Sequence, residues 1–131
     1  MERTYVMLKP DAVRRNLIGK IIARIEDKGF KIIRMELMSP ERSVFEEHYA
    51  HVPEQFKGET IDFMTSGPVV GMVVEGNHVI ESIRILMGDK KWNLAAPGTI
   101  RGDFANETTY NLIHGSDSPE TAEIEIKRFF G

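Results

Sequence analysis

Residues 4–38, TYVMLKPDAVRRNLIGKIIARIEDKGFKIIRMELM, decide the fold of this chain. The first five are mainly apolar and rich in β-formers, and Lys9 precedes a proline that ends the run, which predicts a short buried strand. Isoleucine then recurs at helical spacing over residues 18–25, which predicts an amphipathic helix. Residues 31–38 alternate around apolar side chains and predict a second strand. The stretch therefore predicts a strand, a helix and a second strand in that order.

The rest of the chain repeats this order after a helical insert. Helices are expected at residues 41–50, 56–64 and 79–87 and from residue 119 onward, and strands at residues 69–74 and 112–113. The order predicts an α+β fold of the ferredoxin-like (βαββαβ) type, a four-stranded antiparallel sheet with helices on one face. Residues 89–110 show little periodicity, and a loop of that length in a compact domain is generally functional.

Length, composition and charge narrow the class of protein. A chain of 131 residues is long enough for a proper core, and we expect residues 1–131 to form a single domain. The chain has no apolar run long enough to span a membrane, no signal-peptide pattern and no cysteine, which together favour a cytoplasmic protein. Its formal net charge of −3 argues against general electrostatic binding to nucleic acid.

Residues 111–118, NLIHGSDS, carry the strongest indication of chemistry. They place His114 after a short hydrophobic strand, at the edge of the expected sheet, and before serine hydroxyls that can cap the last helix. We expect Gly115 to make a sharp turn with positive φ. Glu125 follows inside that helix, within reach of the ring. An imidazole with a partner carboxylate can act as a nucleophile or general base, although such a histidine more often has a structural role.

Cationic and polar side chains gather at element ends and in the long loop. These are Lys9, Arg84, Lys90, Arg101 and Asn111. Guanidinium and ammonium groups beside a nucleophilic imidazole suggest a phosphate substrate, because they match phosphate oxygens and stabilise the charge that develops in phosphoryl transfer. Any one of them taken singly is more often a solvated surface charge.

Aromatic and acidic residues near these positions leave further alternatives open. Tyr49 and Phe56 flank the helical insert and fit core positions, or, for the phenyl ring, stacking on a nucleotide base. Asp11 and Asp117 stand beside the expected phosphate positions, but without a dense acidic cluster they do not make a protein metal site. Magnesium would therefore arrive on the phosphates of the substrate.

Four blocks of the chain closely resemble nucleoside diphosphate kinases. They are residues 2–4 with Lys9-Pro10-Asp11, residues 66–70 (SGPVV), residues 97–104 (PGTIRGDF) and residues 111–118 (NLIHGSDS). The similarity runs in collinear order from residue 2 to about residue 130. The family has a ferredoxin-like core, so the resemblance implies the fold that the hydrophobic pattern also predicts.

The resemblance implies a ping-pong phosphoryl transfer with His114 as the nucleophile. A nucleoside triphosphate would donate its γ-phosphate to the ring, and a second nucleoside diphosphate would take it back. Glu125 and Ser116 would orient the ring. Mg²⁺ would bridge phosphate oxygens, as metals commonly do in this chemistry, with no protein ligand of its own.

The same resemblance implies a nucleotide-binding set at matching positions. Lys9 and Asn111 would bond the ribose hydroxyls and the reacting phosphate, Tyr49 and Arg101 would steady the γ-phosphate, Arg84 would clamp the β-phosphate, and Phe56 would stack on the base. Lys90 aligns with a phosphate-binding threonine of the family and would contact phosphate as a charge. Stacking on one aromatic face near solvent is consistent with weak base specificity, because no buried donor pattern would reject the wrong base.

This chain departs from the family pattern at several positions. Trp92 takes the place of a proline in a loop that helps to pack subunits together. The segment between Tyr49 and Ser66 is about one residue short, and Thr60 and Thr108 stand where apolar base-contacting residues are usual. We therefore expect an altered nucleotide affinity or preference, with the chemistry retained.

Other functions and assemblies stay open at the level of sequence. A catalytically impaired homologue would bind nucleotides in a regulatory role, although every residue of the catalytic set is present. A ferredoxin-like sheet can also bind single-stranded RNA, but the third strand, residues 69–75, carries no aromatic side chain for stacking. His114 could also pass phosphate to proteins as a side activity. Relatives form hexamers or tetramers, and we favour a homo-hexamer built from dimers, with a tetramer as the alternative.

Overall fold

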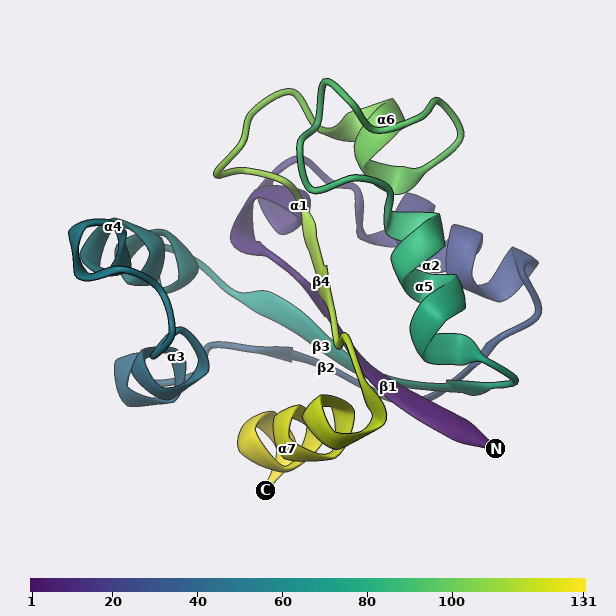
Figure 1. Cartoon of the computed structure of the whole chain (residues 1–131), viewed down its shortest axis with the longest axis horizontal. Coiled ribbons are helices and arrows are strands. Elements are labelled where there is room, and N and C mark those ends of the chain that lie inside the picture. The colour runs from purple at the N-terminus through teal and green to yellow at the C-terminus, as the bar shows by residue number, and fades with distance from the viewer.

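The computed structural model describes all 131 residues, and Figure 1 shows how its strands and helices are arranged. In chain order they are β1 (Glu2–Leu8), α1 (Pro10–Arg14), α2 (Ile18–Asp27), β2 (Lys31–Met38), α3 (Arg42–His48), α4 (Glu54–Met64), β3 (Val69–Gly76), α5 (Val79–Met87), α6 (Ile100–Phe104), β4 (Ile113–Gly115) and α7 (Pro119–Phe130).

The four strands form one antiparallel sheet in the order β2-β3-β1-β4. β1 pairs with β3 along its whole length, from Glu2 opposite Gly76 to Leu8 opposite Val70. On its other side β1 pairs with the short edge strand β4, where His114 stands opposite Met7. Helix α2 leads from β1 to β2 past β3, and α5 leads from β3 towards β4 past β1. This is the split βαβ topology, so the predicted ferredoxin-like fold is confirmed.

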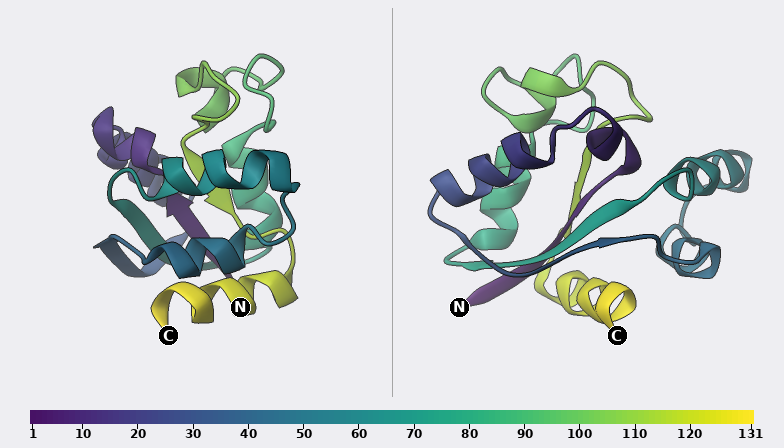
Figure 2. Two further views of the ribbon diagram at one scale, coloured as in Figure 1. Left: turned by 90° about the vertical axis from the view of Figure 1, so that its left-hand side faces the viewer. Right: turned by 180° about the vertical axis from the view of Figure 1, so that it is seen from behind.

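The larger core lies between one face of the sheet and helices α2 and α5, which share that side in Figures 1 and 2. Alternate residues of the two central strands point into it, among them Val6 and Leu8 of β1 and Met72 of β3. The isoleucines of α2 meet these side chains, and Ile21 and Ile25 are fully buried. The helical spacing seen in the sequence is therefore the contact stripe of this helix.

The opposite face of the sheet is also covered, so the expectation that helices lie on only one face is wrong. Helix α7 crosses below the sheet in Figure 1, and the α3–α4 insert stands at its end. Tyr5 and Met7 of β1 point to this side, and the Tyr5 ring stacks on Phe129 at 4.8 Å between centroids. The physical reason is that consecutive residues of β1 are all apolar, and a strand of that kind needs cover on both faces.

Two five-residue helices were not predicted, because a helix of less than two turns is too short to show a hydrophobic periodicity in the sequence. Helix α1 begins at Pro10, a residue suited to the first helical position. Helix α6 lies in the stretch expected to be a loop, where the Thr99 hydroxyl caps it by accepting from the Gly102 amide at 3.0 Å. Residues 89–110 thus hold an anchored helix, and this helix carries Arg101.

The expectation that Gly115 adopts a positive φ in a sharp turn is also wrong. The positive φ, +76°, belongs to Leu112, and Gly115 lies within β4. A Cβ atom at Gly115 would stand 2.7 Å from Met87 Sδ, so the glycine lets α5 approach the strand closely. The predicted cap of the last helix is confirmed, since Ser118 Oγ accepts from the Thr121 amide at 3.1 Å.

None of the helices combines the length and apolar composition that crossing a bilayer requires.

Candidate active site

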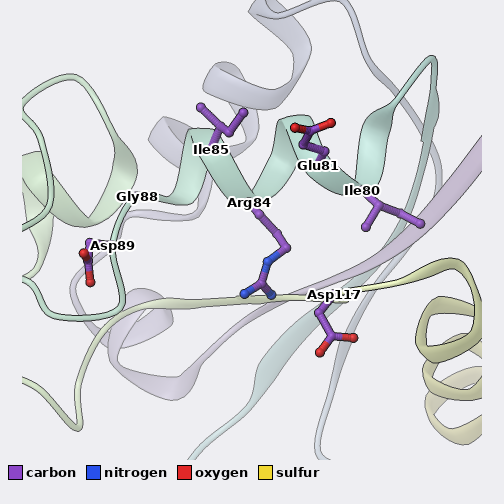
Figure 3. A pocket seen from close by; sticks show the side chains of 7 residues that line it. All are labelled: Ile80, Glu81, Arg84, Ile85, Gly88, Asp89 and Asp117. Atoms are coloured by element: carbon purple, nitrogen blue, oxygen red, sulfur yellow. The ribbon is translucent and has the colours of Figure 1, made fainter.

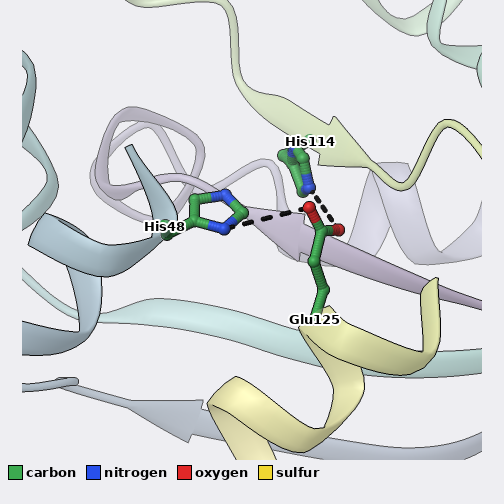
Figure 4. A group of neighbouring side chains, drawn as sticks. All are labelled: His48, His114 and Glu125. Carbon is green, nitrogen blue, oxygen red and sulfur yellow. Dashed lines mark hydrogen bonds and ion pairs between the residues drawn. The ribbon is translucent and has the colours of Figure 1, made fainter. Parts of the chain in front are cut away.

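The site is built around the His114 ring, which projects from β4 towards α7 (Figure 4). Its Nε2 lies 2.8 Å from Glu125 Oε1, and the same oxygen accepts a hydrogen bond from Ser116 Oγ at 2.7 Å. The Glu125 side chain is 7% exposed. Burial alone would raise the pKa of Glu125, but hydrogen bonds from His114 and Ser116 and the charge of His114 outweigh it and hold that pKa below its usual value.

An ionised carboxylate can only accept hydrogen bonds, which assigns the proton of the neutral His114 ring. Nε2 must donate to Glu125, so the lone pair lies on Nδ1. Ser116 Oγ also lies within hydrogen-bond distance of the Tyr5 main chain, so β1 helps to hold the group in place. The arrangement presents an oriented nitrogen nucleophile at the edge of the sheet.

Lys9 and Asn111 meet at the end of β1. Lys9 Nζ donates to Asn111 Oδ1 at 2.9 Å, and the Asn111 amide donates to the Thr108 carbonyl at 3.1 Å. Burial and then the charge of Arg101 lower the pKa of Lys9 to about 8. The Asp11 carboxylate opposes this shift, and the smaller effect of Lys90, which is exposed on the loop, lowers the pKa of Lys9 further.

Arg101 is buried and holds three segments together. Its guanidinium donates to the carbonyls of Asn111 (3.2 Å), Gly88 (3.2 Å) and Ile113 (2.6 Å). Because a guanidinium carries five N–H groups, two remain for a substrate. Burial and then the charge of Arg84 lower the pKa of Arg101 to about 10, so it remains a cation at neutral pH.

Arg84 extends from α5 to β4 and donates to the Gly115 carbonyl at 3.1 Å. It lines two hollows. One, of about 570 Å³, lies on the outer side of α5 and includes Asp89 and Asp117 (Figure 3). The other, of about 460 Å³, includes His114 itself and lies between the end of α3, β4 and α7. Arg84 is therefore the cation that borders the nucleophile from the α5 side.

The remaining predicted residues lie farther out. Tyr49 follows α3 and packs edge-on against the His48 ring at 4.7 Å, and burial raises its pKa. Phe56 stands on α4 with 53% of its surface exposed, a position open to a planar ligand. Asp11 has a structural contact, because its carboxylate accepts from the amide of Leu112 at 3.2 Å. That bond supports the positive φ that precedes β4.

Sequence reasoning missed two residues, His48 and Arg128. The His48 ring stands perpendicular to the His114 ring with centroids 4.8 Å apart, and Arg128 Nη1 lies 2.9 Å from His48 Nδ1. One signal was present for Arg128, since it follows Glu125 by three residues and so shares its face of α7. His48 had no such signal beyond its place next to Tyr49.

His48, His114 and Glu125 are the one group of residues whose types could ligate a metal ion, with ligand atoms within 4.8 Å of one another. Those atoms already have hydrogen-bond partners. Glu125 Oε1 binds His114 Nε2 and Ser116, and Arg128 presents a cation to His48 Nδ1. These three residues therefore form a hydrogen-bonded network around the His114 ring.

Fold and site together define a candidate phosphotransferase with a histidine nucleophile, and the comparisons with known proteins identify its family. The family model described as nucleoside diphosphate kinase matches residues 2–131. The chain belongs to the nucleoside diphosphate kinase family.

Relatives support this assignment over nearly the full length of both partners. The nucleoside diphosphate kinase of Brevibacillus brevis is 53% identical over 131 residues, 99% of this chain and 89% of the relative. That of Archaeoglobus fulgidus is 50% identical, over 99% of this chain and 87% of the relative. A solved nucleoside diphosphate kinase from Halobacterium salinarum, in complex with CDP, superposes with a TM-score of 0.94 at 47% identity and covers 98% of this chain and 87% of its own.

Proposed function

We propose that this nucleoside diphosphate kinase transfers phosphate through a phosphohistidine at Nδ1 of His114. The observation that carries the proposal is the 2.8 Å contact between His114 Nε2 and Glu125 Oε1. It leaves the Nδ1 lone pair free and puts a negative charge behind the ring. We further propose that residues 1–131 act as one domain.

The first half of the reaction is a displacement at the γ-phosphorus. The Nδ1 lone pair forms the bond to phosphorus, the bond to the β–γ bridging oxygen breaks, and the nucleoside diphosphate leaves with that electron pair. Nε2 keeps its proton, so the ring gains positive charge as the bond forms. The Glu125 carboxylate stabilises that charge. A second nucleoside diphosphate then attacks the phosphohistidine and reverses these steps.

The cations of the site are suited to the negative charge of the phosphates. We assign Lys9 and Asn111 to the ribose hydroxyls and the reacting phosphate, Tyr49 and Arg101 to the γ-phosphate, Arg84 to the β-phosphate and Lys90 to an outer phosphate contact. The two free N–H groups of Arg101 and the position of Arg84 beside β4 support this arrangement. The Halobacterium salinarum relative binds CDP, which is consistent with a diphosphate in the same cleft.

Base recognition falls to an exposed ring in this proposal. Phe56 offers one aromatic face on α4 and no buried hydrogen-bond donor, which favours low selectivity among bases. Thr60 and Thr108 would tune affinity around the base.

Magnesium would enter with the nucleotide. Cations and an amide predominate around the expected phosphate positions, and the nearby carboxylates of Asp11 and Asp117 are too few to form a cage for a bare divalent ion. When bound, the ion neutralises phosphate charge, and the residues above position the phosphates.

We propose that the chain assembles with copies of itself, as a hexamer or alternatively a tetramer. Strand β2 is an edge strand, and it exposes Ile33, Met35 and Leu37 by 40%, 50% and 66%. An apolar edge of this kind is an aggregation hazard unless a partner covers it, and a second copy is the partner that we favour. A cytoplasmic location stays a prediction from the sequence.

The test is the intact mass of the protein after mixing with ATP and Mg²⁺. Wild type should gain one phosphoryl group, about 80 Da, in an acid-labile form that GDP removes. His114→Ala should show no gain, whereas His78→Ala, a change at an exposed histidine of the β3–α5 turn, should behave as wild type. ATP binding without any gain in mass would refute phosphotransfer and leave a nucleotide-binding protein.

A further inference from the structure

Arg128 reaches from α7 to the side of His48 that faces the nucleophile's carboxylate. Its Nη1 lies 2.9 Å from His48 Nδ1, and its Nε lies 3.7 Å from Glu47 Oε1. The Arg128 side chain is 15% exposed and that of His48 is 3% exposed. Two elements far apart in sequence thus meet at a buried contact that the reaction described above does not use.

The chemistry of this contact assigns the proton of His48. A guanidinium is always a donor at ordinary pH, so His48 Nδ1 must accept and the ring proton must sit on Nε2. Burial, and then the charges of His114 and Arg128, lower the pKa of His48 to about 3 against the opposing charge of Glu125. His48 is therefore neutral, with one defined tautomer.

The tautomer matters because Glu125 lies within reach of the same nitrogen. His48 Nδ1 is 3.9 Å from Glu125 Oε2, while His114 Nε2 is 2.8 Å from Oε1 (Figure 4). A His48 ring that carried a proton on Nδ1 would become a second donor to this carboxylate after a small rotation. It would then weaken the negative charge that stands behind the nucleophile.

We infer that Arg128 is a positioning residue, which holds His48 in its Nε2–H form and so reserves the Glu125 carboxylate for His114. This role rests on the proposed function of His114. It acts through His48, because the polar contacts of the Arg128 guanidinium are with His48 and Glu47. The other charged or titratable groups that face this cluster come from four parts of the fold. They are Tyr5 from β1, Glu47, Tyr49 and His51 near the end of α3, Arg84 from α5, and His114 and Asp117 from β4 and the turn after it.

The direct test reads the tautomer itself in the nucleotide-free protein. Long-range proton–nitrogen spectra of histidine-labelled wild type should show His48 with the proton on Nε2 and no titration between about pH 5 and pH 8. In Arg128→Met, His48 should populate the Nδ1–H form and stay neutral, because burial and the charge of His114 still hold its pKa low. A wild-type His48 protonated on Nδ1, or an unchanged His48 in Arg128→Met, would overturn the inference.

The catalytic consequence is tested by a double-mutant cycle. Arg128→Met should slow phosphoenzyme formation about 3- to 10-fold, because an Nδ1–H form of His48 competes with His114 for the Glu125 carboxylate. The same change in a His48→Phe background should alter the rate by less than about twofold, since no competitor remains. Arg128→Lys should restore part of the rate because it keeps a donor. Lys127→Met, an exposed change on the same helix, is the matched control.

A purely structural role would give another pattern. Arg128→Met would then lower the melting temperature and the rate equally in both backgrounds, and that result would overturn the inference. Failure of the proposed function is separable, because the tautomer is measured without turnover. A wild type that forms no phosphoenzyme would refute the kinase mechanism and leave the tautomer result intact.

Discussion

Replacing Glu125 by glutamine removes one charge from the site and leaves its shape nearly unchanged. Glu125 Oε1 accepts from His114 at 2.8 Å and from Ser116 at 2.7 Å, and a glutamine carbonyl can accept both bonds. What is lost is the negative charge behind a ring that becomes positive as Nδ1 bonds to phosphorus. The effect should therefore fall on the rate of phosphorylation more than on stability.

The magnitude follows from the kind of hydrogen bond. A bond to a charged group contributes about 1.5–3 kcal/mol, and a bond between neutral groups about 0.5–1.5 kcal/mol. The barrier should thus rise by about 1–2 kcal/mol, which slows phosphoenzyme formation roughly 5- to 30-fold. Nucleotide affinity should change little, because Glu125 has no contact with Lys9, Arg84 or Arg101.

Rapid-quench measurement of phosphoenzyme formation from ATP isolates this step from nucleotide release. Glu123→Gln, an exposed change on α7, provides the matched control and should match wild type. A Glu125→Gln rate within about twofold of wild type, with the same melting temperature, would refute the reasoning that the carboxylate stabilises the charged ring.

Three further outcomes are expected. kcat/KM should fall as pH rises through about 8, where Lys9 loses its proton, and pH–rate profiles should show no such fall in Lys9→Arg, whose guanidinium stays charged. Gly115→Ala places a Cβ 2.7 Å from Met87 Sδ and should lower the free energy of unfolding, measured in urea, by about 1–3 kcal/mol. Gly58→Ala lies in the interior of α4, where a Cβ meets no neighbouring atom, and should raise that free energy by up to about 1 kcal/mol. Phe56→Ala should raise the KM for ADP and GDP alike, roughly 5- to 150-fold, if stacking on the base contributes about 1–3 kcal/mol; an effect on one base only would contradict the stacking role.

Much of the fold could be predicted because its signals are local. The strand at residues 4–8, the helix around Ile21 and the strand at residues 69–74 each show a hydrophobic period that a short window contains. Helices α1 and α6 are too short to show one. That both faces of the sheet are buried could in principle be predicted, because Tyr5 and Met7 alternate with Val6 and Leu8 and all four are apolar. That α7 covers the second face could not be predicted from these residues.

The candidate site divides in the same way. The sequence by itself determined the family and supplied the residue types of the candidate site. Residues 111–118, for example, carry His114, the proposed nucleophile, together with Gly115 and the capping Ser118 in one continuous run. Contacts between residues that are distant in sequence leave no such continuous pattern. Arg128 and His48 are 80 positions apart, and the local sequence around each residue does not predict its contact with the other.

Only the tertiary structure decided which nitrogen of His114 is free to react. α7 packs across β1 through Tyr5 and Phe129, and this packing brings Glu125 to Nε2 and leaves Nδ1 open. The same packing carries Arg128 to His48. The tautomer of a histidine ring depends on the hydrogen-bond partners around it. Here the two rings and their partners come from β4, α3 and α7, which are distant in sequence and come together only in the folded core.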